Sequence, residues 1–369
     1  MIPGDIRVAL IGFGYAGRVF HAPLISATPG LTLAVIGSRQ GHGVRSAYPD
    51  AALVSDPLSA ARHPDVDLVV IATPNDTHAL LAEAALRAGK HVVVDKPFTI
   101  TLAEAHALAA LAEQVERVLS VFQNRRWDSD FLAVRREITG GRVGEVVELR
   151  SEMSRYRPEV RDRWRERAGP GSGVWYDLGP HLIDQALVLF GPPESVQADL
   201  RVQRRGGSAV DWFHVVLGYG PMRVILTSSM LATDAPARFL VRGAEGSLTK
   251  RGGDVQEDQL LAGKTPGSSG WGLDPGPLVF VGGDERAPAE LAVPPGNYPG
   301  YYTAIRDVIR GEGNLPVAPA EATTVMAVIE AGMRSSVEAT VISPSYTEAE
   351  RSAWKPAGPY VRGGRCDGG

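Results

Sequence analysis

The first third of the chain alternates short apolar runs with segments rich in alanine and leucine, and this alternation constrains the fold more than any other feature. The apolar runs include RVALIG, LTLAVIG, VDLVVIATP, HVVVDKP and VLSVFQN, and the segments between them include THALLAEAALRAGK and LAEAHALAALAEQ. Runs that are apolar on both faces are typical of parallel strands covered by helices on each side. The sequence therefore predicts a doubly wound α/β domain over residues 1–122.

The sequence pattern changes from about residue 123, first to a charged and glycine-rich stretch and then to segments in which apolar and polar residues alternate. GEVVELRSEM, SVQADLRVQ, WFHVVLGYG and RVILTSSML alternate apolar and polar residues, as half-exposed antiparallel strands do. Helices are expected at GPHLIDQALVLFG, YYTAIRDVIRG and AEATTVMAVIEAGMRSSVEA. We therefore predict a second, open-sheet domain over residues 123–342 and a flexible C-terminal tail over residues 343–369.

Composition agrees with a folded, soluble, two-domain chain of 369 residues, because 44% of them are hydrophobic and 22% are charged. The formal charge of −4, from 38 basic and 42 acidic residues, provides no overall field that would attract nucleic acid or an anionic membrane. Cys366, the only cysteine, lies in the tail, and no apolar run approaches the length of a membrane span. These features favour a cytoplasmic protein that binds a small molecule.

A glycine-rich turn, IGFGYAG, follows the first apolar run and precedes the segment RVFHAPLIS. In a dinucleotide-binding loop, the first glycine permits a tight turn, the second lets backbone approach a pyrophosphate, and the third lets the helix pack on the strand. A glycine-rich turn of some other α/β protein is the alternative, which the surrounding βαβ rhythm disfavours. We therefore expect a Rossmann domain whose loop binds the cofactor through Gly12, Phe13, Gly14, Tyr15, Ala16 and Gly17.

The second apolar run ends at Ser38 and Arg39, about 20 residues past the glycines, where an NAD site normally offers a carboxylate to the ribose 2′-hydroxyl. A hydroxyl followed by a guanidinium suits a 2′-phosphate instead, because arginine presents several donors to an oxyanion. The alternative is that Arg39 is a solvated surface residue. The pair predicts a preference for NADP(H).

The run HVVVDKP ends on a charged pair, Asp95 and Lys96, immediately before Pro97. A strand of a doubly wound sheet delivers its C-terminal end to the crevice where ligands bind, and a residue before proline is held in extended geometry. A lysine ammonium positioned there could stabilise negative charge that develops on a reacting oxygen. The alternative is an exposed lysine that caps a helix or pairs with Asp95.

The string WYDLGPHLIDQAL is the second candidate for chemistry. Pro180 favours the first helical position, so a helix is expected to begin near Gly179 with His181 in its first turn. The helix N-terminus disfavours a cationic imidazole, which would keep His181 neutral and able to accept a proton. Asp177 or Asp184 could orient the ring. The alternatives are a turn or cap role for Asp177 and a structural role for His181 in a domain interface.

Beside a nicotinamide site, Lys96, Asp177 and His181 would form a suitable set for hydride transfer at a secondary alcohol. His78 lies in the βα loop TPNDTH near the expected crevice and is a candidate for contact with the cofactor. The other histidines lack the spacing of metal ligands, so no metal is expected. Three further residues of the same loop are also candidates for contact with the cofactor: Thr73, Pro74 and Asn75.

In its order of GxGxxG, ATPNDTH, DKP and YDLGPHLID, the chain resembles the glucose-fructose oxidoreductase / inositol dehydrogenase (Gfo/Idh/MocA) family of Rossmann-fold oxidoreductases. Strings such as HVVVDKPFT, GPGSGVWYDLGPHLIDQA and PGNYPGYYTAIRD resemble those of its NADP-dependent scyllo-inositol 2-dehydrogenases. The resemblance extends to about residue 340. It implies an α+β second domain with a large, mostly antiparallel open sheet, often used for dimerisation, so a homodimer or homotetramer is expected.

The resemblance also implies that Lys96, Asp177 and His181 match the catalytic lysine, aspartate and histidine of the family. His181 would remove the hydroxyl proton as hydride leaves for the nicotinamide, and Lys96 would hold the same oxygen. Asp177 would orient the substrate or the base. The family usually carries glutamate before the lysine, and the shorter Asp95 leaves the contact of this acid with the cofactor open.

Further cofactor contacts are implied by the same resemblance, which supports Ser38 with Arg39 and adds a Trp–Arg pair and a tyrosine ahead of a late helix. The Trp–Arg pair could instead be part of a solvated basic loop, RYRPEVRDRWRERAG, and the tyrosine could be a core residue. The added positions are Trp164, Arg165 and Tyr301, together with Asn124 after the run VLSVF and with Asp95 and Lys96 beside the nicotinamide.

The activity that the resemblance implies is NADP(H)-dependent interconversion of scyllo-inositol, or a related cyclic polyol, with its ketone scyllo-inosose. An NADPH-dependent reductase of sugar or anhydro-sugar ketones would use the same three residues and is the first alternative. A non-catalytic NADP(H)-sensing regulator is the second, but a sensor has no need of Lys96, Asp177 and His181 together.

Overall fold

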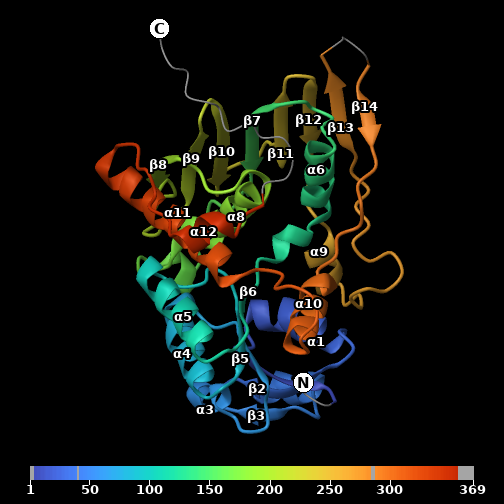
Figure 1. Ribbon diagram of the computed structural model, residues 1–369, viewed down its shortest axis with the longest axis vertical. Helices are drawn as coiled ribbons and strands as arrows, with labels where there is room; N and C mark the ends of the chain where they lie inside the picture. The colour runs from blue at the N-terminus through green and yellow to red at the C-terminus, as the bar shows by residue number, and fades with distance from the viewer. Residues whose placement is uncertain (1–3, 40, 284–286, 356–369) are drawn as a thin grey trace. The chain divides into compact units, whose positions relative to one another are not determined.

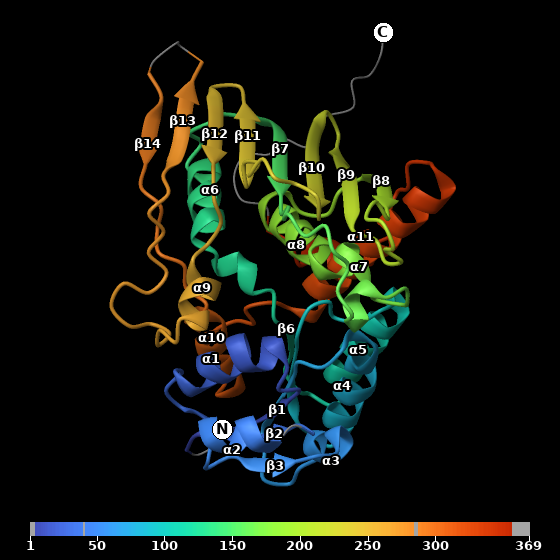
Figure 2. The same cartoon turned by 180° about the vertical axis from the view of Figure 1, so that it is seen from behind.

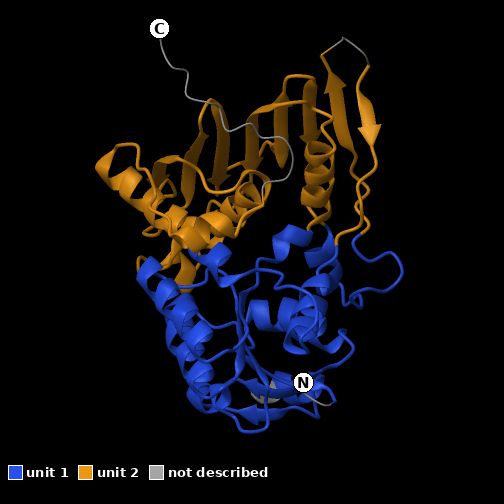
Figure 3. Ribbon diagram, viewed as in Figure 1, with its two compact units in different colours: residues 1–127, 255–272, 297–323 blue, residues 128–254, 273–296, 324–369 orange. Residues whose placement is uncertain are grey.

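The computed structural model describes residues 4–39, 41–283 and 287–355, and the chain divides into two compact units (Figure 3). Unit 1 comprises residues 1–127, 255–272 and 297–323. Unit 2 comprises residues 128–254, 273–296 and 324–369. Each unit has its own sheet.

Unit 1 contains a six-stranded sheet whose strands follow the order β3-β2-β1-β4-β5-β6, and every neighbouring pair in it is parallel. This is the strand order of a Rossmann fold, so the predicted α/β Rossmann doubly wound parallel sheet is confirmed. The strands are β1 (Ile6–Ile11), β2 (Leu31–Gly37), β3 (Ala52–Val54), β4 (Leu68–Ile71), β5 (His91–Val94) and β6 (Leu119–Val121).

Helices lie on both faces of this sheet, with α3, α4 and α5 on one side and α1 with α10 on the other (Figures 1 and 2). All four residues of β4 are buried because the sheet is covered twice, which explains why its sequence does not alternate. The helices are α1 (Ala22–Ser26), α2 (Gly41–Ala47), α3 (Pro57–Ala61), α4 (His78–Arg87), α5 (Leu102–Gln114), α9 (Gln256–Leu261) and α10 (Pro299–Ile309).

The segment after the glycine loop begins as a π-helical turn, Gly17–His21, and continues as α1. Pro23 lies at the start of α1. A proline inside a helix lacks an N–H and crowds the carbonyl of the preceding turn, and the wider π turn before it accommodates both effects.

Unit 2 contains an eight-stranded sheet with the order β14-β13-β12-β11-β7-β10-β9-β8, in which only β7 and β10 pair in parallel among the described strands. The predicted large, mostly antiparallel open sheet is therefore confirmed. The strands are β7 (Val146–Glu152), β8 (Ser195–Arg201), β9 (Trp212–Tyr219), β10 (Met222–Ser229), β11 (Phe239–Gly243), β12 (Gly246–Lys250), β13 (Leu278–Gly282) and β14 (Ala289–Leu291).

Helices pack on this second sheet, α6 against β12 and β13, α7 against β9, and α8 against β10. Alternate residues of β10 are buried and the ones between them are more exposed, as the sequence pattern predicted. The helices are α6 (Ser129–Thr139), α7 (Gly173–Asp177), α8 (Gly179–Phe190), α11 (Pro319–Glu338), which begins within unit 1, and α12 (Glu348–Ser352).

The structure divides the chain differently from the predicted boundaries of 1–122, 123–342 and 343–369. Residues 255–272 and 297–323, which the prediction assigned to the second domain, belong to unit 1. Part of the predicted tail is structured, because α12 begins with a capping box at Thr347 and the buried Trp354 donates a hydrogen bond to Thr324 Oγ1 at 3.1 Å. Residues 356–369, with Cys366, lie outside the described residues.

Candidate active site

The glycine loop at the end of β1 has the backbone that a dinucleotide site requires. Gly12 has a φ of +95°, and a Cβ on it would lie 2.4 Å from the carbonyl oxygen of Ala72. A Cβ on Gly17 would lie 2.0 Å from the carbonyl oxygen of Gly12, so the helix could not begin so close to the strand with any larger residue. Gly14 is exposed, and a Cβ there would meet no atom within 4 Å. The loop therefore packs tightly on its inner side and leaves space for a pyrophosphate outside.

Two side chains of the loop contact other parts of unit 1. The Tyr15 hydroxyl donates a hydrogen bond to Glu257 Oε1 at 2.7 Å, and Phe13 packs edge-on against Tyr48. The rest of the Tyr15 side chain is exposed beside Gly14. Tyr15 is thus held in place at the opening of the loop.

The end of β2 carries no acidic side chain. The N–H of Ser38 donates to the carbonyl of Val54 at 2.9 Å, which extends the pairing of β2 with β3 by one residue. Arg39 follows and is exposed. Both residues leave the carboxyl end of the strand, where the ribose of a bound dinucleotide lies in this fold.

The predicted cofactor residues of unit 1 follow the carboxyl ends of five parallel strands, which meet at one edge of the sheet. In strand order across the sheet, they are Ser38 after β2, Gly12 after β1, Thr73 after β4, Lys96 after β5 and Asn124 after β6. The order reverses between β1 and β4, which is the switch point where ligands bind in open α/β sheets. The prediction that these residues share one edge is consistent with the sheet.

The Asp95 carboxylate turns inward. It is 6% exposed, and its Oδ1 accepts a hydrogen bond from the N–H of Lys96 at 2.8 Å and lies 3.8 Å from His21 Nε2. Burial opposes ionisation, but His21 and Lys96 outweigh it and hold the pKa of Asp95 below its usual value. Lys96, which is partly buried, follows directly and is joined to Pro97 by a cis peptide bond.

His21 connects Asp95 to a distant tyrosine that sequence reasoning missed. The Nδ1 atom of His21 is 2.6 Å from the hydroxyl of Tyr302, and both side chains are fully buried. The His21 ring also packs against Phe122, with 4.4 Å between ring centroids. Only the position of His21, four residues after the last loop glycine, gave a signal, and nothing in the sequence indicated its partner 281 residues away.

His78 bridges two loops at the strand ends. Its Nδ1 lies 2.8 Å from the carbonyl oxygen of Pro97, and its Nε2 lies 3.0 Å from that of Thr73. The ring is buried, and this burial lowers its pKa despite Asp95 and the two carbonyls, which act in the opposite direction. His78 therefore joins the loop after β4 to the loop after β5, and its ring nitrogens are engaged by protein atoms. Asn75 is buried in the same loop, while Pro74 is exposed.

Tyr301 belongs to the core of unit 1. Its side chain is fully buried, its hydroxyl donates to Ser120 Oγ at 3.0 Å, and its ring packs edge-on against Phe122 and Trp127. Burial also raises its pKa far above the usual value. These contacts favour the alternative that Tyr301 is a core residue, and its contact with the cofactor stays a prediction.

In unit 2, α7 and α8 position Asp177 and His181. Asp177 is the last residue of α7, and α8 begins two residues later with Gly179 and Pro180. His181 is therefore in the first turn of α8, as predicted, and it is 4% exposed. Asp184, one turn further along α8, is buried as well.

The structure also brings the predicted Trp–Arg pair close to Asp177. The guanidinium of Arg165 stacks over the Trp164 ring at 4.9 Å from its centroid, and Arg165 Nε lies 3.9 Å from Asp177 Oδ1. Trp164 is 36% exposed, and the short 3-10 helix Trp164–Glu166 carries both residues. The predicted site residues of unit 2 thus form one group, and those of unit 1 form another.

A Rossmann sheet with an open glycine loop, together with a lysine at a strand end and a histidine at a helix start, defines an oxidoreductase that uses a nicotinamide dinucleotide. Comparison with known proteins gives the family. The description "Oxidoreductase family, NAD-binding Rossmann fold" matches residues 6–123, and "Oxidoreductase family, C-terminal alpha/beta domain" matches residues 135–343. The chain belongs to the Gfo/Idh/MocA family of oxidoreductases, as the resemblance implied.

Relatives and solved structures agree with this assignment. The uncharacterized oxidoreductase YdgJ of Escherichia coli is 52% identical over 90% of this chain and 96% of its own length. The scyllo-inositol 2-dehydrogenase (NADP(+)) IolW of Bacillus subtilis is 37% identical over 91% of this chain and 95% of its own. A crystal structure of an oxidoreductase from Klebsiella pneumoniae has a TM-score of 0.89 at 48% identity and covers 95% of this chain and 98% of that one. Among the described residues, no helix is long and apolar enough to cross a membrane.

Proposed function

We propose that this chain catalyses NADP(H)-dependent hydride transfer between a cyclic polyol or sugar and its ketone, with scyllo-inositol and scyllo-inosose as the first pair to test. The observation that carries the proposal is that Lys96, Asp177 and His181 stand in a chain similar to IolW over 91% of its length. The cytoplasmic location and the homo-oligomer expected from the sequence stay predictions.

In the proposed reaction, the bound nicotinamide supplies the hydride acceptor or donor. His181 takes the proton of the reacting hydroxyl during oxidation and returns it during reduction. Lys96 donates a hydrogen bond to the same oxygen and stabilises the charge that develops on it. Asp177 orients the substrate or the imidazole. The inward contacts of Asp95 with His21 and with the N–H of Lys96 hold the backbone from which the lysine side chain departs.

The absence of a carboxylate at the end of β2 supports NADP over NAD. Arg39 is exposed there and can offer its guanidinium to a 2′-phosphate. Ser38 precedes it and adds a hydroxyl.

The test is an assay of the purified chain with NADP⁺ and NAD⁺ against scyllo-inositol, myo-inositol and a set of aldoses, with scyllo-inosose and NADPH for the reverse direction. We expect turnover of a polyol with NADP⁺, and a loss of about 100-fold or more in kcat for Lys96→Ala. Activity on sugar ketones but on none of the inositols would show that the chain is instead an NADPH-dependent reductase of sugar ketones. NADPH binding without any turnover would favour the sensor.

The cofactor preference has its own variant in the same assay. Arg39→Asp is expected to lower the ratio of kcat/KM for NADP⁺ to that for NAD⁺ by about 100-fold, because a carboxylate repels the 2′-phosphate and accepts from a 2′-hydroxyl. Arg87→Asp is the matched control, since Arg87 is an exposed arginine that pairs only with Glu83 on α4 among the described residues. An unchanged ratio in Arg39→Asp would show that Arg39 does not distinguish the 2′-phosphate of NADP⁺ from the 2′-hydroxyl of NAD⁺.

A further inference from the structure

A hollow in unit 2 has more arginines than carboxylates in its walls. Its carboxylates are Glu166 and Asp177, the second of which is the predicted catalytic aspartate. The arginines come from three stretches of chain that meet here: Arg155 and Arg157, Arg163 and Arg165, and Arg204. The hollow is therefore lined by one candidate catalytic residue, Asp177, and carries a surplus of positive charge.

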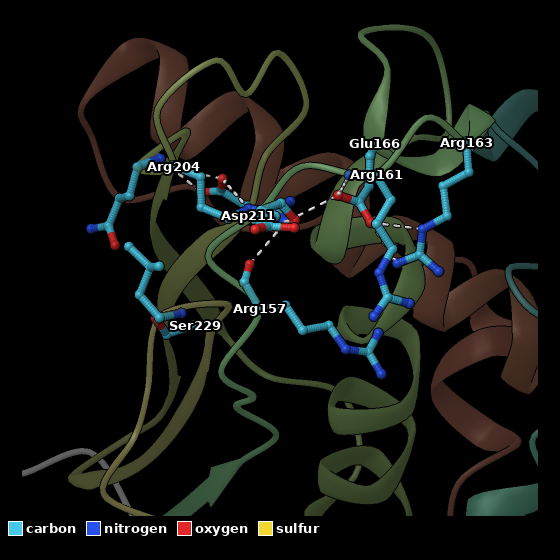
Figure 4. A network of polar contacts seen from close by, with 10 residues as sticks. Arg157, Arg161, Arg163, Glu166, Arg204, Asp211 and Ser229 are labelled. Atoms are coloured by element: carbon cyan, nitrogen blue, oxygen red, sulfur yellow. Dashed lines mark hydrogen bonds and ion pairs between the residues drawn. The ribbon is translucent and has the colours of Figure 1, made fainter.

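Three of these arginines have carboxylate partners: Arg165 lies near Asp177, as described above, and Arg163 and Arg204 hold the walls together (Figure 4). Arg204 lies 2.9 Å from Asp211 Oδ2 and 3.0 Å from Glu166 Oε2, and all three side chains are buried. Arg163 lies 2.6 Å from Glu166 Oε1. Removal of either arginine would leave a buried carboxylate with one counter-charge fewer, so both have a structural role.

Arg155 and Arg157 differ, because neither guanidinium has a carboxylate within ion-pair distance among the residues that the structure describes. Their backbone is fixed, however. The N–H of Arg155 donates to the Ser229 carbonyl at 2.8 Å, and the N–H of Arg157 donates to the Met230 carbonyl at 2.7 Å. In this extended segment, side chains two residues apart share a face, so both arginines point to the same side while Tyr156 between them is exposed.

The surplus charge is unfavourable without a ligand. Partial burial lowers the pKa of Arg157, and the neighbouring charges of Arg155, Arg161 and Arg163 lower it further. Figure 4 shows Arg157, Arg161 and Arg163 extending toward one another. Asp177 acts in the opposite direction, but it is one charge against several. Since arginine does not lose its proton in proteins, a bound anion would relieve the remaining repulsion.

We propose that this hollow binds an oxyanion carried by the substrate, a carboxylate or a phosphate on a polyol or sugar, through Arg155 and Arg157. Guanidinium groups offer planar pairs of donors that match such oxyanions. Because Asp177 lines the same hollow, the anion would lie beside the group that orients the substrate. The inference rests on the proposed function and narrows it, since acidic polyols or sugars should be preferred over their neutral counterparts.

The experiment compares matched pairs of substrates in the full-length protein with NADP⁺: glucose with glucuronate and with glucose 6-phosphate, and myo-inositol with myo-inositol 1-phosphate. We expect a higher kcat/KM for at least one anionic member of a pair. A preference for glucuronate would identify the bound anion as a carboxylate, and a preference for a phosphorylated substrate would identify it as a phosphate. In the double variant Arg155→Gln/Arg157→Gln, the ratio of anionic to neutral kcat/KM should fall about tenfold or more. The control Arg167→Gln removes an exposed arginine of the same loop, paired with Asp162, and should leave the ratio unchanged.

Calorimetric titration of glucuronate and glucose 6-phosphate in the presence of NADP⁺ tests the hollow without turnover. We expect binding to the wild type and loss of about tenfold in affinity in the double variant. Equal ratios and equal affinities in both proteins would overturn the inference, even if neutral polyols are oxidised and the proposed function holds. A rise in KM for NADP⁺ alone would also overturn it, because the arginines would then bind the phosphates of the cofactor. Failure to turn over any substrate, with anion binding lost in the variant, would refute only the proposed function.

Discussion

The inward turn of Asp95 gives this residue a partner on each side. His21 lies between it and Tyr302, and the three side chains form a buried polar line through the core of unit 1. Buried polar groups are costly unless they are paired, so each member depends on the next. The acid before Lys96 is therefore held by contacts in the protein interior in this chain.

Removal of one member should affect the others. Tyr302→Phe and His21→Leu are each expected to lower the free energy of unfolding by about 1–3 kcal/mol, because each leaves a buried polar atom without its partner. The double variant should be less destabilised than the sum by about 1 kcal/mol. Tyr301→Phe is the control, since its hydroxyl bonds Ser120 instead, and it should combine additively with His21→Leu. Chemical denaturation provides the measurement, and additivity in the His21 and Tyr302 pair would contradict the predicted coupling.

For single residues, the sequence could locate those that follow the ends of strands, but not those that form contacts between distant segments of the chain. The glycine loop, Ser38 and Lys96 each follow a recognisable apolar run, so their place at the edge of the sheet follows from topology. Tyr302 lies in another segment of unit 1, and the local pattern equally suited Tyr301 for the cofactor. The difference between the two tyrosines depends on packing.

In unit 2, the strands that the sequence identified are those with enough residues to show a period. β9 and β10 have eight residues each and alternate clearly, whereas β14 has three residues, all of them at least partly exposed. β14 is positioned by pairing with β13 rather than by its own pattern. The helices α6 and α9 were likewise not expected, because they lie in text that reads as charged or glycine-rich.

β5 provides a prediction about pH. His91 opens this strand, and its Nδ1 accepts a hydrogen bond from the N–H of Val118 at 3.0 Å, next to β6. Burial, with the charge of Arg117, lowers the pKa of His91 to about 4. The folded state therefore binds fewer protons than the unfolded state between about pH 4 and the unfolded value of about 6.5, so stability falls as pH drops through this window.

Between pH 7 and pH 5 this histidine should account for a loss of at most about 2 kcal/mol in the free energy of unfolding. His91→Asn keeps an acceptor near Val118 but does not titrate, so its stability should change less over the same range. Urea denaturation at both pH values, in wild type and variant, measures the difference. Identical pH dependence in the two proteins would show that His91 titrates normally.

At the scale of the molecule, unit 1 is built from three separate segments of chain. The two late segments supply groups that the Rossmann strands and loops use. They include Tyr302 for His21, Glu257 for Tyr15, and the carbonyl of Val317, which accepts from Ser120 Oγ at 2.8 Å. Apolar periodicity described the first segment well, but no local signal shows that residues 255–272 and 297–323 return to it.

A fragment of residues 1–122 should therefore form secondary structure without a stable core. It lacks Tyr298, Tyr301, Tyr302 and Ile305, which are fully buried in the complete chain. We expect helical circular dichroism, strong binding of the dye ANS and no cooperative thermal transition. The full-length chain is the control. A sharp transition near the melting temperature of the full-length protein would show that the first segment folds alone.

The same discontinuity affects how the protein is made. Residue 127 completes the first segment of unit 1, and residue 323 completes the last, so about 200 further residues must be translated before unit 1 has all its parts. At a translation rate of about 5–20 residues per second, roughly 10 to 40 seconds pass between synthesis of the Rossmann strands and synthesis of the tyrosines that cover them. During that interval the apolar surface that α10 later buries lacks its cover, and such transiently exposed surface is what chaperones of emerging polypeptides bind.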